Sequence, residues 1–176
     1  IHPGGHFYLP VVEGLVRKGY EVVCYYNFHA MDGWTEKFRS AATQFYQVHQ
    51  WSDGRLADTI KADGIDILFE GAGHMAGNRL LAAARKPAPL QIGTALYPNT
   101  TGLAAIDFRL LDERVALPEA ELYHSEKVIR LPETHFCYRP LDVDVAPANR
   151  TPAWENGYIT FGSFNNAIKL NDLTVE

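Results

Sequence analysis

The feature that most restricts the fold of this chain is a repeated alternation between helical and extended patterns of apolar residues. Apolar residues recur at helical spacing in some segments and form short continuous runs in others. The predicted strands are 21–26, 44–49, 65–69, 90–94, 107–111 and 127–131, and the predicted helices are 7–16, 34–42, 53–62 and 78–85. Alternation of this kind is typical of βα units, whose helices pack on a parallel sheet. The sequence therefore predicts an α/β fold with a parallel sheet.

The helix ends fit this pattern. Lys18 and Gly19 supply a basic last turn and a terminating glycine for the first helix. Asp53 is expected to cap the helix over 53–62, because its carboxylate can accept hydrogen bonds from free backbone amides. Pro87 follows the helix over 78–85, and proline cannot continue a helical hydrogen-bond ladder.

The chain is predicted to divide at a stretch with prolines at positions 140, 147 and 152 and few large apolar groups. We take residues 1–139 as one lobe, 140–156 as an extended linker, and 157–176 as the start of a second lobe with a strand at 158–161. The chain begins at Ile1, and no strand precedes its first loop. We therefore expect the first strand of the first lobe to be missing.

Composition excludes some classes of partner. The 176 residues contain 16 Lys and Arg against 21 Asp and Glu, a net charge of −5. Nucleic acids and anionic membranes attract basic surfaces, so neither is an expected partner, and no apolar stretch is long enough to span a bilayer. Cys24 and Cys137 form neither a disulfide framework nor a zinc knuckle, which fits a reducing cytoplasm.

The first candidate loop is His2-Pro3-Gly4-Gly5-His6 at the start of the first helix. Its two glycines let a ligand approach the backbone, and the imidazole of His2 can act as a general base near neutral pH. The alternative is that His2 is a surface residue and His6 a core or capping residue. No third ligand accompanies the two histidines, so we expect no metal site.

Two more candidate loops follow predicted strands, where ligand groups collect in parallel sheets. In the segment 70–77, three glycines surround His74, but their G-x-G-x-x-x-G spacing does not fit a dinucleotide fingerprint. His74 could contact a sugar or phosphate, or be a structural histidine bonded to its own loop. The second loop, Ala95–Gly102, is rich in hydroxyl and amide groups, and could be a binding loop or an ordinary connection.

The tract Phe161–Lys169 places Gly162, an amide pair and one lysine between a predicted strand and the beginning of a helix that Asn171 or Asp172 could cap. A lysine held there can neutralise a nucleotide diphosphate. The alternative is that Lys169 is an ordinary solvated lysine near a helix start.

Taken together, these tracts resemble the catalytic region of the O-linked N-acetylglucosamine transferases and the SPINDLY proteins, in family order over essentially the whole chain. The matching stretches are Glu21–Asn27, Ala62–Leu68, Gly73–Leu80, Arg85–Gln91, Tyr97–Gly102, Ile106–Asp107 and Phe161–Lys169.

The resemblance implies a GT-B glycosyltransferase with two Rossmann-like lobes, of which this chain would hold the N-terminal one, inversion at the sugar carbon, and no cofactor or metal. It implies that His2 helps to deprotonate the acceptor hydroxyl and that Lys169 and Asn166 contact the donor nucleotide. It also implies that His74 and the loop residues Tyr97, Pro98, Asn99 and Thr100 line the cleft.

The activity that the resemblance implies is transfer of N-acetylglucosamine from UDP-GlcNAc to serine or threonine of an acceptor protein or peptide. Two alternatives stay open: transfer of fucose from GDP-fucose, as in SPINDLY, and a noncatalytic lobe that binds proteins. Part of the family carries helical TPR repeats before the catalytic region. The 176 residues alone are expected to be inactive, because the second lobe is not complete within them.

Overall fold

The computed structural model describes residues 4–94, 96–140, 146, 148–164, 166, 168 and 171. Contacts divide the chain into two compact units, Ile1–Leu141 and Asp142–Glu176, which we treat separately. The elements of the first unit are α1 (Gly4–Arg17), β1 (Val23–Tyr26), α2 (Gly33–Ala41), β2 (Gln44–Gln47), α3 (Asp53–Ala62), β3 (Ile67–Glu70), α4 (Leu80–Ala83), β4 (Leu90–Gly93), β5 (Phe108–Asp112), a 3₁₀ turn (Ala120–Leu122) and β6 (Lys127–Leu131).

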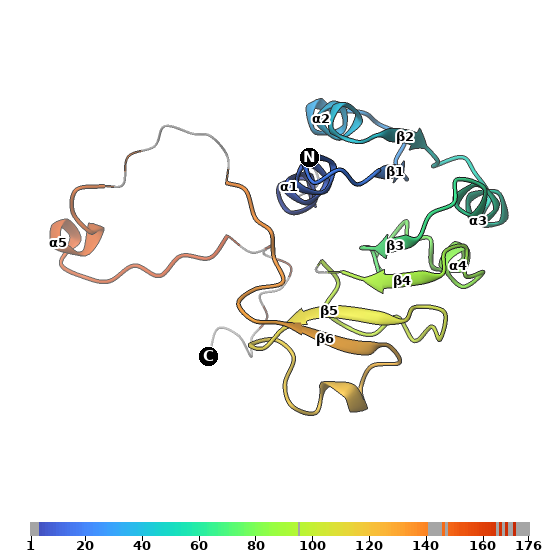
Figure 1. Ribbon diagram of the computed structural model, residues 1–176. Coiled ribbons are helices and arrows are strands. Elements are labelled where there is room, and N and C mark those ends of the chain that lie inside the picture. Colours follow the sequence, from blue (N-terminus) through green and yellow to red (C-terminus); the bar gives the residue numbers. More distant parts are fainter. Residues whose placement is uncertain are drawn as a thin grey trace. The chain divides into compact units, whose positions relative to one another are not determined.

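Every strand pair of the first unit is parallel, as the alternating sequence pattern predicts. The strands form two hydrogen-bonded groups: β1 pairs with β2, and β3, β4, β5 and β6 follow one another in sequence order (Figure 1). In the part of the chain that the structure describes, no ladder joins β1 to β3, so the single predicted sheet is divided at this place.

Helix ends explain the local boundaries. Asp32 caps α2, accepting hydrogen bonds from the amides of Trp34 and Thr35 at 3.0 Å each. The cap of α3 is Ser52 rather than the predicted Asp53: the Ser52 hydroxyl accepts from the Arg55 amide at 3.2 Å. Asp53 lies in the first turn, where its carboxylate binds Arg79 at 2.7 Å. The predicted helix over 78–85 is reduced to the short α4, since Asn78 folds back into a turn on Met75.

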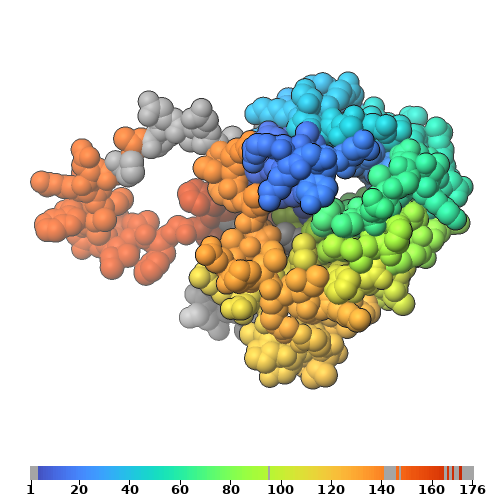
Figure 2. Space-filling view, in the orientation of Figure 1, coloured from blue at the N-terminus to red at the C-terminus, as the bar shows by residue number. Residues whose placement is uncertain are grey.

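The main apolar core lies where α3 covers the strands. It consists of Val48, Leu56, Ala57, Ile60 and Ala82, each at most 4% exposed. The end of the unit returns to its beginning: the amide of Arg139 donates to the carbonyl of His6 at 2.9 Å, and Phe136 packs on Phe7 with 5.2 Å between ring centroids. Figure 2 shows this orange segment against the blue helix α1. The last residues of the first unit therefore pack against the start of α1.

The second unit contains α5 (Pro152–Asn156), which begins with proline in its first turn and ends at Gly157 with φ 74°. These residues fall in the stretch expected to be an extended linker. The predicted strand at 158–161 is not formed: these residues have no regular secondary structure and no neighbouring strand among the described residues. A strand needs a partner for its backbone groups, which accounts for the difference.

Candidate active site

The carboxyl end of β3 turns sharply because its last side chain binds the loop that follows. The carboxylate of Glu70 accepts hydrogen bonds from the amides of Ala72, at 2.9 Å, and Gly73, at 2.9 and 3.0 Å. Glu70 therefore has a definite role, to hold the first turn of the loop 71–77, which the sequence alone did not reveal.

The loops after β3 and β4 meet at a close contact between Gly73 and Tyr97. Gly73 has φ +50°, and a Cβ atom placed there would lie 2.1 Å from Cδ1 of Tyr97. A side chain at position 73 is therefore excluded twice, by backbone conformation and by the ring of Tyr97. This contact brings together two segments that the sequence singled out separately.

His74 completes the junction between the two loops. Its Nε2 lies 2.9 Å from the carbonyl oxygen of Thr101, and its ring meets that of Tyr97 edge-on, with 5.7 Å between centroids. A carbonyl only accepts, so Nε2 must carry the proton, and in the neutral ring Nδ1 is then an acceptor. The exposed His74 ring is thus suited to receive a hydrogen bond from a hydroxyl or amide of a ligand.

The loop 96–102 is attached to the start of β6 by a buried carboxylate. Glu126, 3% exposed, accepts from the Thr101 amide and the Thr100 hydroxyl at 2.7 Å each, and also from the Thr101 hydroxyl. Burial raises the pKa of Glu126, but the hydrogen bonds from Thr101 and Thr100 outweigh it and keep the pKa below its usual value. The Thr100 hydroxyl therefore binds Glu126 and helps to fix its own loop.

Helix α1 reaches the same strand ends through Tyr8. Its hydroxyl lies 2.7 Å from Oγ1 of Thr94, and the Thr94 amide donates to the carbonyl of Glu70 at 2.8 Å. Burial raises the pKa of Tyr8, so its hydroxyl keeps its proton at neutral pH. The ends of β3 and β4 and the first half of α1 thus form one connected surface.

The remaining predicted residues lie in different surroundings. Pro98 and Asn99 are exposed at the tip of the loop after β4. Asn166, in the second unit, is exposed, and its Oδ1 accepts from the amide of Ile168 at 3.1 Å. His2 and Lys169 lie outside the described residues. The roles predicted for all these residues stay predictions.

His6 is a packing residue, one of the two roles left open for it. Its ring lies 4.4 Å from that of Trp34, centroid to centroid, and its Nδ1 lies 3.1 Å from the carbonyl oxygen of Arg139. Gly5 beside it has no room for a Cβ atom, which would lie 2.9 Å from the Trp34 ring. The start of α1 is thereby fixed against α2.

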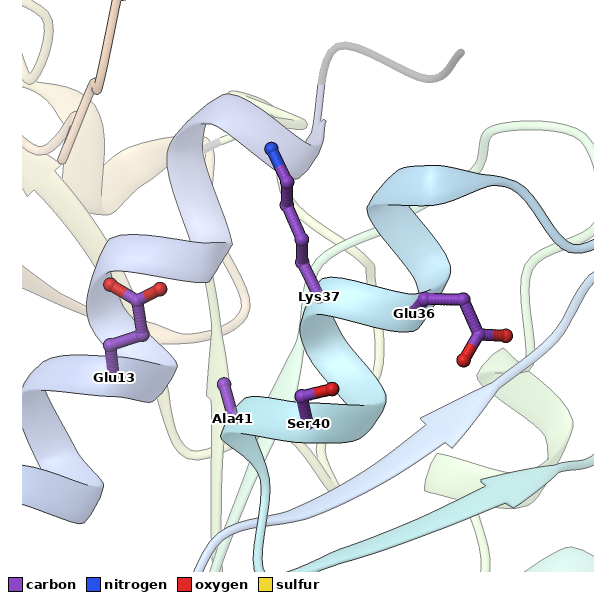
Figure 3. Close-up of a pocket in the computed structure, with 5 residues that line it drawn as sticks. All are labelled: Glu13, Glu36, Lys37, Ser40 and Ala41. Atoms are coloured by element: carbon purple, nitrogen blue, oxygen red, sulfur yellow. The ribbon is translucent and has the colours of Figure 1, made fainter.

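A hollow of about 460 Å³ lies elsewhere, between α1 and α2 (Figure 3). It is lined by Glu13, Glu36, Lys37, Ser40 and Ala41. Figure 3 shows Glu36 pointing away from α1, and no predicted site residue takes part in the lining. We therefore take the strand ends, and not this open hollow, as the candidate site.

The described residues contain neither a cluster of metal ligands nor a membrane-spanning helix. No three or more His, Cys, Asp or Glu residues there are grouped so that they could hold a metal ion. Likewise, no helix in the described ranges is both long and apolar enough to cross a membrane.

Comparison with known proteins decides the family. The sequence profile described as glycosyl transferase family 41 matches residues 1–140. The chain belongs to this family. The predicted resemblance is thereby confirmed, and the match to residues 1–140 covers every element of the first unit described above.

Family 41 relatives include plant proteins and a solved bacterial structure. The chain is 38% identical over 157 residues to a rice protein named as a probable UDP-N-acetylglucosamine–peptide N-acetylglucosaminyltransferase SPINDLY, covering 87% of this chain and 17% of that protein. It is 32% identical over 180 residues to the Arabidopsis thaliana protein SEC, which bears the same enzyme name; that match covers 97% of this chain and 18% of that protein.

A lysine-to-methionine mutant of the Thermobaculum terrenum O-GlcNAc transferase superposes with a TM-score of 0.79 at 35% identity, over 84% of this chain and 29% of that one. The predicted fold class, an α/β N-terminal lobe of a GT-B glycosyltransferase, is confirmed by this likeness. The chain spans about a sixth of the length of the plant family 41 proteins that it matches.

Proposed function

We propose that the family 41 protein to which these residues belong transfers N-acetylglucosamine from UDP-GlcNAc to serine or threonine hydroxyls of acceptor proteins, with inversion at the sugar carbon. The observation that carries this proposal is the family match over residues 1–140, together with relatives whose names state this activity. The geometry supports it, because the loops 71–77 and 96–102 meet at the strand ends, where α/β folds bind ligands.

In the proposed reaction, the imidazole of His2 accepts the proton of the acceptor hydroxyl as its oxygen attacks the anomeric carbon. The bond from that carbon to the diphosphate oxygen breaks on the opposite face, and the electron pair leaves with UDP. Lys169 neutralises the charge that develops on the diphosphate, and Asn166 contacts the nucleotide.

His74 fits a contact to the sugar better than one to the diphosphate. With Nε2 donating to Thr101, the neutral ring offers an acceptor at Nδ1, whereas phosphate oxygens require donors. We therefore propose that His74 receives a hydrogen bond from a hydroxyl or the amide of the sugar. Tyr97, Pro98, Asn99 and Thr100 shape the wall beside it, Thr100 by holding its own loop.

The test is a radiolabelled transfer assay with the full-length protein and an acceptor peptide. We expect His2→Ala to lower kcat by about 100-fold or more, because a positioned general base is lost. Lys169→Ala should lower kcat by about 100- to 1,000-fold, because charge on the leaving group is no longer compensated. The exposed residues His29 and Lys18 supply matched controls, His29→Ala and Lys18→Ala, which should transfer at the wild-type rate.

Transfer that is unchanged in both His2→Ala and Lys169→Ala contradicts this mechanism. A parallel arm with GDP-fucose tests the alternative of fucose transfer, which the resemblance to the SPINDLY proteins left open. Absence of transfer from both donors, with retained peptide binding, points instead to a noncatalytic protein-binding lobe.

We further propose that transfer needs no cofactor or metal, since a lysine can supply the compensating charge. Full activity after dialysis against EDTA is the expected result. A reducing cytoplasm is the proposed compartment, and it suits the free thiols of Cys24 and Cys137.

A further inference from the structure

Arg109 is a buried cation that has neither a hydrogen-bond nor an ion-pair partner among the described residues. It is the second residue of β5, it is 0% exposed, and its three guanidinium nitrogens are buried without hydrogen-bond partners among the described residues. Nor does any ion pair in that part of the chain include it. A buried charge of this kind is costly, so its presence needs a physical explanation.

The backbone around Arg109 is shaped to admit it. A Cβ atom at Gly93, on the neighbouring strand β4, would lie 2.6 Å from Nη1 of Arg109. The guanidinium carbon lies 5.8 Å from the centroid of the Tyr97 ring, the same ring that covers Gly73. Arg109 is therefore placed beneath the junction of the loops 71–77 and 96–102.

Each of these loops is held by one carboxylate. Glu70 binds the amides of Ala72 and Gly73, and Glu126 binds the amide and hydroxyl of Thr101. A charged carboxylate accepts such hydrogen bonds more strongly than a neutral acceptor does. No cation forms an ion pair with either of them among the described residues.

We propose that Arg109 is a positioning residue whose buried guanidinium supplies one shared counter-charge for Glu70 and Glu126, and so fixes both cleft loops and His74 at their junction. The surrounding groups support this assignment. Burial lowers the pKa of Arg109, while the charged or titratable groups of Glu126, Glu70, Tyr8 and Tyr97 raise it. Each carboxylate holds one of the two loops that meet at Gly73 and Tyr97, so one buried cation beneath this junction can serve both.

The first test measures the loops directly, by hydrogen exchange of the full-length protein, and needs no enzymatic activity. In Arg109→Met, the peptides covering 71–77 and 96–102 should exchange about tenfold faster than in wild type, because both carboxylates lose their counter-charge. In Arg109→Lys, which keeps a charge, most of the protection should return. The peptide covering β2 is the internal control and should be unchanged.

A pH series separates electrostatic support from simple packing. Without the cation, the pKa of Glu126 should rise, so that protection of 96–102 is lost at a higher pH in Arg109→Met than in wild type as the solution is acidified. A variant that merely leaves a cavity would loosen the loop equally at every pH.

Glu126→Gln provides an independent variant should Arg109→Met fold poorly. It should loosen 96–102 and leave 71–77 protected, since Glu70 still has its counter-charge.

The proposal is overturned if Arg109→Met leaves both loops at wild-type exchange rates, or if the β2 peptide opens to the same extent as the loops. These outcomes are independent of whether the protein transfers sugar. Where transfer from UDP-GlcNAc is observed, a role for Arg109 in the cleft rests on the proposed function, and predicts a larger rise in donor KM than fall in kcat. A fall in kcat that is larger than the rise in donor KM would assign Arg109 to the chemical step instead.

Discussion

The strand-end loops of the first unit and residues 158–164 of the second unit differ in how far their side chains contact one another. Around the loops, carboxylates, hydroxyls and rings are almost all engaged: Glu70, Thr101 and Glu126 each make short hydrogen bonds, and Tyr97 covers Gly73. In the second unit, large side chains lie in the open, with Phe161 92% and Ile159 72% exposed.

The difference shows that a strong sequence motif and a formed site are separate properties. The Phe161–Lys169 tract is the most suggestive run for binding a diphosphate, yet its described residues have no core of their own. The loops after β3 and β4 have weaker motifs, but their side chains bind one another. The identity of a residue can indicate its chemical role. Its position in space is fixed only by the residues that pack against it.

The largest effect should come from Gly73→Ala, which tests how tightly the loop region is built. The new methyl group would meet the Tyr97 ring at a residue with φ +50°, so we expect a loss of about 3 kcal/mol from clash and strain together. Gly77→Ala is the matched control: φ is +75° there, but nothing lies within 4 Å, so only strain of about 1 kcal/mol is expected. Urea unfolding measures both, and equal losses would contradict the packing argument.

Next in size is a dependence on pH that arises from Asp112 at the end of β5. Its carboxylate accepts from the amides of Arg114 and Val115, at 2.9 and 3.0 Å, and from the ring and amide of His135. The hydrogen bond from the His135 side chain, with these others, lowers the pKa of Asp112 to about 2. Like Glu70, Asp112 is thus a carboxylate at the end of a strand that holds the loop after that strand.

Because this pKa is lowered on folding, the stabilisation is complete above the unfolded pKa of about 3.9 and disappears as the pH falls through about 2. In Asp112→Asn, unfolding free energy should therefore fall less steeply between pH 4 and pH 2 than in wild type. Urea unfolding at several pH values in this window gives the two slopes. Identical slopes would show that other groups set the acid sensitivity.

Sequence reasoning found the elements of the first unit, because periodicity reports which faces of strands and helices are buried. It also singled out His74 and the 97–102 loop, because glycines and polar residues after strands are typical of ligand loops, and the structure brings these two segments together. It missed Glu70, Arg109 and Glu126 as a group. Their signals were present, a carboxylate beside each of two strands and one arginine within an apolar strand. Only the folded structure shows that Arg109 is buried and that Glu70 and Glu126 hold the two loops that meet at Gly73 and Tyr97.

The predictions from sequence were also wrong about the cap of α3 and the strand at 158–161. In the first case Ser52 and Asp53 are adjacent, both are good caps, and the choice depends on Arg79, which lies 26 residues further along the chain and takes the Asp53 carboxylate. In the second case the residues favour a strand, but a strand forms only against a partner. Both errors arise because the outcome depends on a contact with residues distant in sequence. Such a contact is present for Asp53, and among the described residues it is not formed for 158–161.

The smallest effect should come from Phe161→Ser in the second unit, and it tests the other half of the comparison. A side chain that is 92% exposed loses little contact when it is replaced, so the unfolding free energy should change by no more than about 0.5 kcal/mol. Leu111→Ala in β5, where the side chain is 2% exposed, should cost about 2 to 5 kcal/mol and serves as the buried reference. A large loss in Phe161→Ser, comparable with that of Leu111→Ala, would mean that this ring is covered in solution, and the contrast between a packed loop region and an open tract would no longer hold.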